Sequence, residues 1–228
     1  MIKAILTDIE GTITRITFVK DILFPYAAAH LPDFVRANHA EPAVAEQVTA
    51  VRQELNQPTA TLDDVIDALL TWIAEDKKIT PLKQLQGLIW QTGYEQGDFT
   101  GHLYPDAMAF LNVMDAQDIA LYVYSSGSVK AQQLLFAYSD FGDVRPLFKN
   151  YFDTKVGGKK EPQSYQTILT QLPYHAHEVL FLSDIVEELD AAKAAGMATL
   201  QLWRDNQASS EQHRKISDFE QFDSEYLA

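Results

Sequence analysis

The sequence predicts an α/β protein with a doubly wound parallel sheet, interrupted after its first strand by an inserted helical domain. Two observations support this prediction. Short apolar runs rich in β-forming residues alternate with helical stretches, which is typical of a parallel sheet with helices on both faces. Between residues 18 and 99, by contrast, apolar residues recur only at helical spacing.

The expected strands are short and buried. The first covers residues 2–7 and ends at Asp8, after which Gly11 allows a tight turn. The other strands are predicted over residues 119–124, 151–153, 179–182 and 198–202. Helices are expected between them, over residues 104–117, 129–138, 162–172 and 187–195. The polar tail from Asn206 on is predicted to have weak helical character.

The inserted segment is expected to contain about four helices and no strand, because its apolar residues follow a helical period. Residues typical of helix starts occur at Asp33, Glu41, Thr59 and Thr80. We therefore predict an α/β catalytic core over residues 1–17 and 100–228, and a helical cap over residues 18–99. Closure of such a cap would exclude bulk water during chemistry.

The composition is that of a globular protein from a reducing compartment, and we expect a cytoplasmic location. The 228 residues include no cysteine, which excludes disulfides, thiolate nucleophiles and sulfur-ligated zinc. The formal net charge of -14 disfavours nucleic acid and anionic membranes as partners. The N-terminus lacks the pattern of a signal peptide, and no run approaches the ~20 apolar residues of a transmembrane helix. No coiled-coil repeat is present, and we expect a monomer.

Acids, hydroxyls and lysines follow four of the predicted strands. Active sites of open parallel sheets lie beyond the carboxyl ends of their strands, so these side chains should meet at one edge. In chain order they are Asp8, Glu10, Thr12, Ser125, Ser126, Lys155, Lys159, Lys160, Asp184 and Glu188.

This set of side chains suits phosphoryl transfer to a carboxylate. A carboxylate can attack phosphorus and carry the phosphoryl group. Acidic oxygens can hold Mg²⁺, while hydroxyls, N–H groups and a lysine can bind phosphate oxygens. A second acid can protonate the leaving oxygen and then activate water. The pattern therefore predicts a Mg²⁺-dependent phosphatase of a small phosphate ester, with a covalent intermediate on Asp8.

Four short motifs resemble those of the haloacid dehalogenase superfamily of phosphatases: DIEGT from Asp8, SSGS from Ser125, a downstream lysine and LFLSD ending at Asp184. The superfamily has Asp as the second acid of its first motif, whereas this chain has Glu10. The enolase-phosphatases (acireductone synthases) of methionine salvage share that departure. The chain resembles them in longer strings, including DIEGTITRITFVKDILFPY and YSSGSVKAQQLLF, over residues 1 to about 202.

The resemblance implies roles for four acids. Asp8 would be the nucleophile and would bind Mg²⁺ through one oxygen, with one ion per subunit. Glu10 would be the general acid and base, and would offer its backbone carbonyl to the metal. Asp184 would be a further metal ligand, and Glu188 would support the metal site.

The resemblance also implies which residues bind the substrate. Ser125 would lie at the phosphate position, with Ser126 as a second substrate-binding residue. Lys159 would hold the phosphate and steady the Asp8 carboxylate. The hydroxyl of Thr12, beside these groups in the inventory of residues after the strands, is expected to bind substrate as well.

The reaction of this family enolises 2,3-diketo-5-methylthiopentyl 1-phosphate and then removes its phosphate, giving 1,2-dihydroxy-3-keto-5-methylthiopentene. We expect the same function here, and hypothesise that Glu10, one methylene longer than Asp, performs the enolisation. The first alternative is a superfamily phosphatase that acts on another small ester. A noncatalytic relative would be expected to lose Asp8, Lys159 or Asp184, and a dehalogenase needs no metal, so both fit these residues less well.

Several polar and aromatic residues have plain structural explanations. Ser128 is expected to cap the helix that begins at residue 129, and Trp72 to pack in a core rather than bind a cofactor. Four residues of the predicted cap could line a pocket or merely pair charges, namely Lys20, Asp21, Lys83 and Gln84.

Overall fold

The computed structural model describes residues 1–75, 77–204 and 207–228. The chain divides into a core unit, Met1–Ile16 with Gly101–Ala228, and a helical unit, Thr17–Thr100. The roles of catalytic core and cap, which the sequence suggests for these two parts, stay predictions. Asn206, where the polar tail begins, lies outside the described residues.

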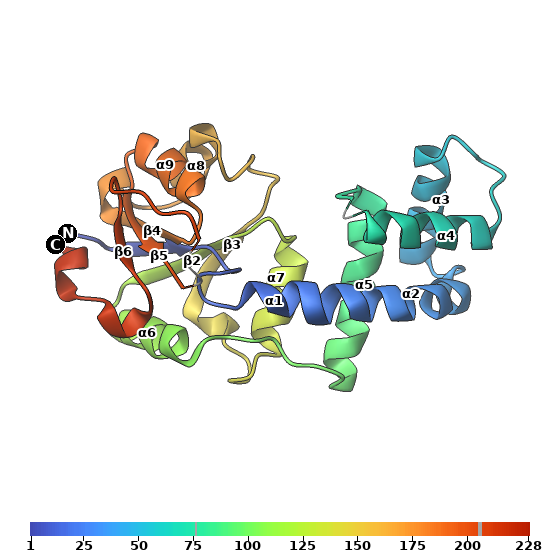
Figure 1. The fold of residues 1–228 in the computed structure, drawn as a ribbon, viewed down its shortest axis with the longest axis horizontal. Helices are drawn as coiled ribbons and strands as arrows, with labels where there is room; N and C mark the ends of the chain where they lie inside the picture. Colours follow the sequence, from blue (N-terminus) through green and yellow to red (C-terminus); the bar gives the residue numbers. More distant parts are fainter. Residues whose placement is uncertain (76, 205–206) are drawn as a thin grey trace. The chain divides into compact units, whose positions relative to one another are not determined.

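A parallel sheet forms the centre of the core unit (Figure 1). Its strands are β1 (Ala4–Thr7), β2 (Ala120–Tyr124), β3 (Phe148–Phe152), β4 (Val179–Ser183), β5 (Ala198–Leu202) and β6 (Arg214–Ile216). They are ordered β3-β2-β1-β4-β5-β6, and every pairing is parallel. The predicted doubly wound α/β fold is thereby confirmed. The chain order reverses at β1, which lies between β2 and β4, and ligands of such sheets bind at a reversal of this kind.

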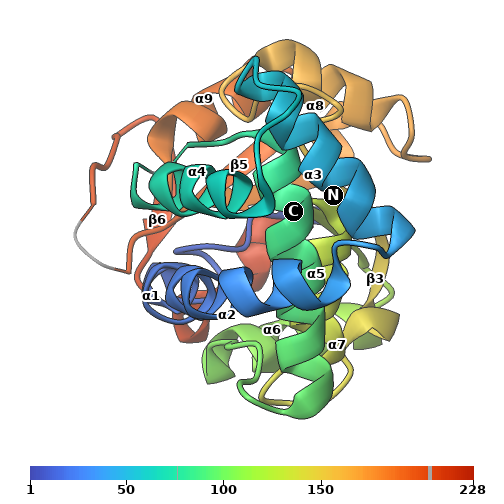
Figure 2. The same ribbon diagram turned by 90° about the vertical axis from the view of Figure 1, so that its right-hand side faces the viewer.

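Helices cover both faces of this sheet. They are α6 (Pro105–Ala116), α7 (Val129–Ala137), α8 (Pro162–Leu169) and α9 (Val186–Ala194). Figures 1 and 2 show α8 and α9 on one face and α6 and α7 on the other. Tyr124, Tyr165, Phe181 and Leu189 are fully buried in the core between the sheet and the first pair of helices. All five predicted strands and the four predicted helices of this unit are present, with ends shifted by a few residues.

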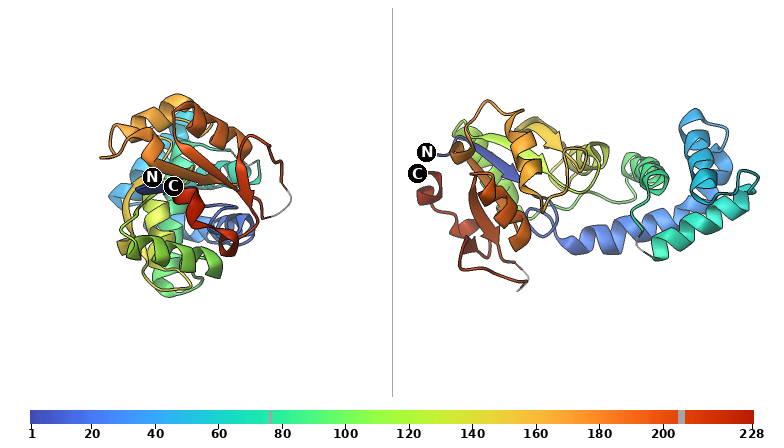
Figure 3. Two further views of the ribbon diagram at one scale, coloured as in Figure 1. Left: turned by 90° about the vertical axis from the view of Figure 1, so that its left-hand side faces the viewer. Right: turned by 90° about the horizontal axis from the view of Figure 1, so that it is seen from above.

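The sixth strand, β6, was missed, and the expectation of weak helical character in the tail was wrong there. Arg214 and Lys215 are exposed and only Ile216 is buried, so three residues alone carry no clear strand pattern. They become a strand because the edge of β5 offers unpaired backbone groups, with Leu202 opposite Ile216. The tail then returns to the start of the chain, where the Ile2 N–H donates to the Leu227 carbonyl at 2.7 Å, and Figure 3 shows the two termini side by side.

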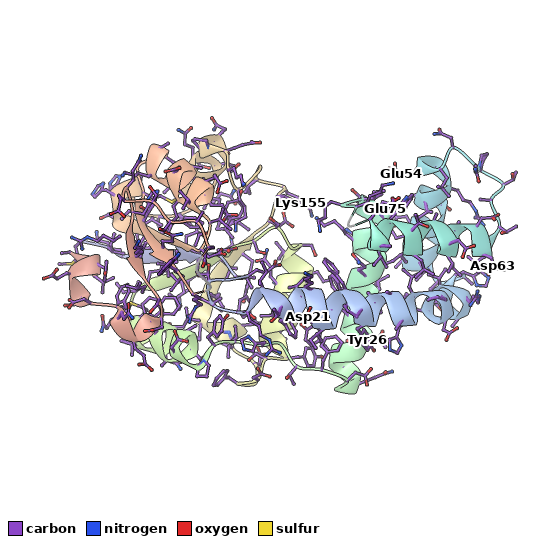
Figure 4. All side chains as sticks on the ribbon, in the orientation of Figure 1. Asp21, Tyr26, Glu54, Asp63, Glu75 and Lys155 are labelled. Carbon is purple, nitrogen blue, oxygen red and sulfur yellow. The ribbon has the colours of Figure 1, made fainter. Side chains whose placement is uncertain are left out.

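The helical unit consists of helices packed around their own apolar core. Its first helix is continuous through α1 (Ile16–Phe18), the π-helical turn Val19–Leu23 and α2 (Phe24–Asn38). The others are α3 (Pro42–Glu54), α4 (Leu62–Ala74) and α5 (Thr80–Gln96). Trp72 packs in this core, as expected. Asp21 and Tyr26 lie on the first helix and Asp63 on α4 (Figure 4). No helix among the described residues is long and apolar enough to cross a membrane.

Two predicted helix starts in this unit agree with the structure and two do not. Helix α3 follows Glu41 and α5 begins at Thr80. Helix α4 is capped by Thr61 rather than Thr59, because the Thr61 side chain and Asp64 form a reciprocal capping box. The predicted start at Asp33 was wrong: this residue lies inside α2, whose buried face continues past the preceding proline.

Candidate active site

The loop after β1 presents the carboxylate of Asp8. The Asp8 N–H donates to the Leu182 carbonyl of β4 at 2.8 Å, so the backbone of this residue still belongs to the ladder. Gly11, with φ of 76°, then turns the chain back, and its N–H donates to the Thr14 carbonyl at 2.8 Å. This turn brings the buried hydroxyl of Thr12 to within 3.4 Å of Asp8 Oδ2, to which it donates.

Lys159 connects this loop to the acid on α9. Its ammonium forms ion pairs with Asp8 Oδ1 and with Glu188 Oε2, the latter at 2.6 Å. Ser183 donates to the same oxygen of Glu188 at 2.8 Å. Burial alone would lower the pKa of Lys159, but the charges of Asp8 and Glu188 outweigh it and raise that pKa above its ordinary value. Lys159 is therefore a fixed cation beside the Asp8 carboxylate.

Of the three lysines after β3, the structure selects Lys159. Only 7% of this residue is exposed, and the Tyr165 hydroxyl holds its loop by donating to the Lys159 carbonyl at 2.7 Å. Lys155, labelled in Figure 4, and Lys160 are exposed. Lys160 pairs with Glu187 across 3.2 Å at the surface. Among these lysines, Lys159 is the one that contacts Asp8.

Asp184 follows β4 and is buried against the first loop. Its carboxylate fills the space where a Cβ on Gly11 would lie, so only glycine allows this close approach. Burial and the negative charges of Asp8 and Glu188 raise the pKa of Asp184 to about 7. Its Oδ1 has no hydrogen-bond partner among the described residues. An unpaired buried carboxylate oxygen is costly unless a cation or solvent contacts it.

The donor set fits a hard divalent cation. Three buried acids, Asp8, Asp184 and Glu188, lie near one lysine, which leaves excess negative charge. Within the described ranges, no three His, Asp or Glu side chains are arranged to hold a metal by themselves. Mg²⁺ usually takes only one or two carboxylates and keeps several waters or substrate oxygens, so two acids and a backbone carbonyl would suffice.

The second polar loop follows β2 and begins with a buried serine. The Ser125 N–H donates to the Phe152 carbonyl at 3.1 Å, and its hydroxyl accepts from the Gly127 N–H at 3.1 Å. Ser126 is exposed. Ser128 caps α7 by accepting an N–H of its first turn, as expected. Because β2 is the neighbour of β1, this loop lies at the same edge of the sheet as Asp8.

The structure thus brings Asp8, Thr12, Lys159, Asp184 and Glu188 together through direct contacts or close approach. The other predicted site residues lie at the same edge of the sheet, Glu10 in the loop after β1, and Ser125 and Ser126 in the loop after β2. Glu10 lies in the same turn, where its backbone pairs with Thr14.

Sequence reasoning missed one supporting residue, Gln201. This fully buried side chain of β5 donates to the main-chain oxygen of Asp184 at 3.0 Å and so fixes the Asp184 loop. A lone amide within the otherwise apolar end of a buried strand is the signal that could have indicated it.

Comparisons with known proteins show what the whole chain is similar to. A family model of haloacid dehalogenase-like hydrolases matches residues 2–196. A Pectobacterium carotovorum protein called Enolase-phosphatase E1 is 54% identical over 98% of this chain and 97% of its own length. One of the same name from Pseudomonas syringae pv. tomato is 56% identical over 96% of each chain. The solved UTR4 protein of Saccharomyces cerevisiae is 35% identical, with a TM-score of 0.82 over 97% of this chain and 100% of its own.

Proposed function

Since this chain belongs to the haloacid dehalogenase-like hydrolases and, among them, to the enolase-phosphatases, we propose that Asp8 is the nucleophile of its phosphatase step. The function is that of an acireductone synthase in methionine salvage. The enzyme enolises 2,3-diketo-5-methylthiopentyl 1-phosphate and then releases phosphate, giving 1,2-dihydroxy-3-keto-5-methylthiopentene. The observation that supports Asp8 most directly is its buried carboxylate, held by Lys159 on one oxygen and Thr12 on the other.

In the first half of the phosphatase step, an oxygen of Asp8 forms a bond to phosphorus while the bond from phosphorus to the substrate oxygen breaks. The departing oxygen takes a proton, for which Glu10 is the proposed donor. In the second half, water attacks phosphorus, Glu10 takes a proton from that water, and the bond to Asp8 breaks to release phosphate. The Lys159 ammonium offsets negative charge on the phosphoryl oxygens throughout.

Members of this phosphatase family generally use Mg²⁺. In this chain one ion per subunit would be held by Asp8, Asp184 and the Glu10 carbonyl, with Glu188 as support. The buried Oδ1 of Asp184, which has no hydrogen-bond partner in the part of the chain that the structure describes, supports this assignment. When bound, the ion would supply positive charge that polarises a substrate oxygen.

The hydroxyls at the same edge are the proposed substrate contacts. Ser125 and Ser126 would bind the phosphate from the loop after β2, together with Thr12. Ser125 is already partly fixed, because its hydroxyl accepts from the Gly127 N–H. Ser126 is exposed and can adjust to the ligand.

Glu10 is the proposed base for enolisation, since the longer side chain would reach a substrate C–H that an aspartate would not. Glu10→Asp should then release phosphate from the pre-enolised substrate faster than it enolises the diketone. The two rates are followed separately, enolisation by ultraviolet absorbance and phosphate by ³¹P spectra. A wild-type enolisation rate in Glu10→Asp would show that the length of the Glu10 side chain is not needed for enolisation.

The decisive experiment is a ³¹P and ultraviolet time course with the diketo phosphate, with and without Mg²⁺, comparing wild type with Asp8→Asn. We expect Mg²⁺-dependent phosphate release with an enediol absorbance, and no release by the variant. Phosphate release from other esters but not from this one would support the phosphatase activity and show that the diketo phosphate is not the substrate. Phosphate release by Asp8→Asn would show that Asp8 is not the nucleophile.

We further propose a monomeric, cytoplasmic enzyme, on the basis of its acidic, cysteine-free composition. Light scattering at micromolar concentration would measure the mass directly, with 25.7 kDa expected for one chain. A mass of twice that value would reject the monomer. Fractionation of the producing cells would test the location.

A further inference from the structure

A part-buried arginine contacts the loop after β1, and it lies in the chain beyond the segment that the hydrolase family model matches. That match ends at residue 196, whereas Arg204 follows β5 in the last part of the core unit. Its Nε donates to the main-chain oxygen of Thr12 at 2.9 Å. The side chain is only 9% exposed.

The guanidinium is held from several directions. It pairs with Asp106, at 2.7 Å from Nη2 to Oδ2 and 3.4 Å from Nη1 to Oδ1, and its central carbon lies 4.0 Å from the Tyr104 ring centroid. The same Asp106 oxygen accepts the Phe219 N–H at 2.8 Å, and the Phe219 ring is 5.4 Å from the guanidinium. Phe219 in turn stacks on Phe110 of α6 with centroids 4.3 Å apart. Arg204 is thus fixed in one geometry, as a planar fork allows and a flexible ammonium does not.

The Thr12 carbonyl is a sensitive point of the catalytic loop. The hydroxyl of the same residue donates to Asp8 Oδ2 across 3.4 Å, which is already long for such a bond. A small rotation of the Thr12 backbone would therefore break it. The neighbouring Ile13 carbonyl also accepts a hydrogen bond, from the Tyr104 N–H at 2.9 Å. The contact of the Thr12 hydroxyl with Asp8 Oδ2 consequently depends on the donors that hold these two carbonyls.

We propose that Arg204 is a positioning residue for the phosphatase step: by holding the Thr12 carbonyl, it keeps the Thr12 hydroxyl on Asp8 and the carboxylate in line for attack. The inference rests on the proposed function, in which Asp8 is the nucleophile. Arg204 touches neither substrate nor metal in this scheme, and acts only through Thr12. Asp106 and the rings of Tyr104 and Phe219 keep the arginine in place.

A double-mutant cycle between Arg204 and Thr12 tests this directly. Arg204→Lys keeps the charge, and can reach Asp106, but cannot donate to both partners with a fixed fork. We expect it to lower kcat for phosphate release about tenfold, with KM changed less than about twofold, since misplacement of a reacting group is felt in the chemical step. In the Thr12→Val background, where the hydroxyl is gone, the same substitution should change kcat by less than about twofold.

Val179→Ala is the structural control, because it loosens a fully buried position at the start of β4 without touching Thr12, Arg204 or the side chains that hold the arginine. We expect a lower melting temperature and a kcat within about twofold of wild type. A loss of kcat in this control as large as in Arg204→Lys would mean that any loosening of the core unit has this effect, and would overturn the proposal. Should Arg204→Lys fail to fold, Asp106→Asn is used instead. We expect it to lower kcat for phosphate release about threefold, and to leave kcat unchanged in the Thr12→Val background.

Two further outcomes would overturn the proposal. They are a wild-type kcat in Arg204→Lys, and equal losses caused by this substitution with and without the Thr12 hydroxyl. Asp8→Asn is assayed in parallel to separate the two proposals. An active Asp8→Asn variant would show that Asp8 is not the nucleophile. An inactive Asp8→Asn variant together with a fully active Arg204→Lys variant would reject only the positioning role of Arg204.

Discussion

Replacement of Lys159 by methionine should both destabilise the core unit and stop catalysis. The ammonium of Lys159 is buried between Asp8 and Glu188, and both ion pairs have little solvent exposure. Methionine keeps the shape of the stem but leaves two acids buried without their cation. Removal of one member of a buried ion pair costs about 3–5 kcal/mol of unfolding free energy. Loss of a group that offsets transition-state charge lowers kcat about 10²–10³-fold.

Urea unfolding in the presence of a chelator measures the first effect, so that no divalent cation replaces the missing charge. Phosphate release with saturating Mg²⁺ measures the second. Lys160→Met is the matched control, because it removes the adjacent lysine, whose pair with Glu187 is more than 60% exposed on both sides. An exposed pair of this kind contributes at most about 1 kcal/mol, so the control should stay nearly as stable and as active as wild type.

The loss of stability in Lys159→Met should also depend on pH in a definite direction. Burial and the charge of Asp8 already raise the pKa of Glu188, and Lys159 opposes that rise. Without the lysine this pKa rises further. An acid whose pKa is higher in the folded than in the unfolded state loses stability as pH increases. The difference in unfolding free energy between wild type and Lys159→Met should therefore narrow as pH falls below neutral.

The double variant Lys159→Met/Glu188→Gln should recover part of the lost stability, because one unpaired buried charge is removed together with its cation. The reasoning would be refuted by a Lys159→Met protein as stable as Lys160→Met, or by a difference from wild type that does not change with pH. A fully active Lys159→Met would refute the catalytic part alone.

Three more changes test other parts of the structure. Gly11→Ala puts a side chain at φ of 76° and into the Asp184 carboxylate, so it should cost about 1–3 kcal/mol and lower kcat at least about tenfold; a wild-type rate of phosphate release would contradict this. The pKa of Asp184 near 7 means that this acid is largely protonated at pH 6, and a cation must displace that proton. Mg²⁺ affinity measured by calorimetry should therefore fall about tenfold from pH 8 to pH 6, and a constant affinity would argue against Asp184 as a ligand. Leu69→Ala empties a fully buried site in the helical unit and should cost about 2–5 kcal/mol there; hydrogen exchange should increase in that unit and not in the core unit, and protection unchanged in both would contradict the packing.

Local sequence determined much of the core unit and the identity of its polar loops. A buried strand must end, and the acids, hydroxyls and glycines that end β1, β2 and β4 are recognisable from their neighbours alone. The helical insertion is equally visible, since its apolar period is helical over many turns. Local signals were insufficient at Asp33, where a buried face that continues along α2 outweighs a helix-start pattern, and at β6, which is a strand only because β5 has a free edge.

The family resemblance pointed to Lys159, but only the tertiary structure shows why one of several chemically equivalent residues reaches the site. Lys155, Lys159 and Lys160 are the same chemical group within six residues, and only the path of the loop after β3 buries the middle one against Asp8. Arg204 meets Thr12 across 192 positions of sequence. The physical reason is common to both cases. Periodicity and propensity act over a few neighbours, whereas these contacts depend on strand order in the sheet, which places loops distant in sequence at one edge.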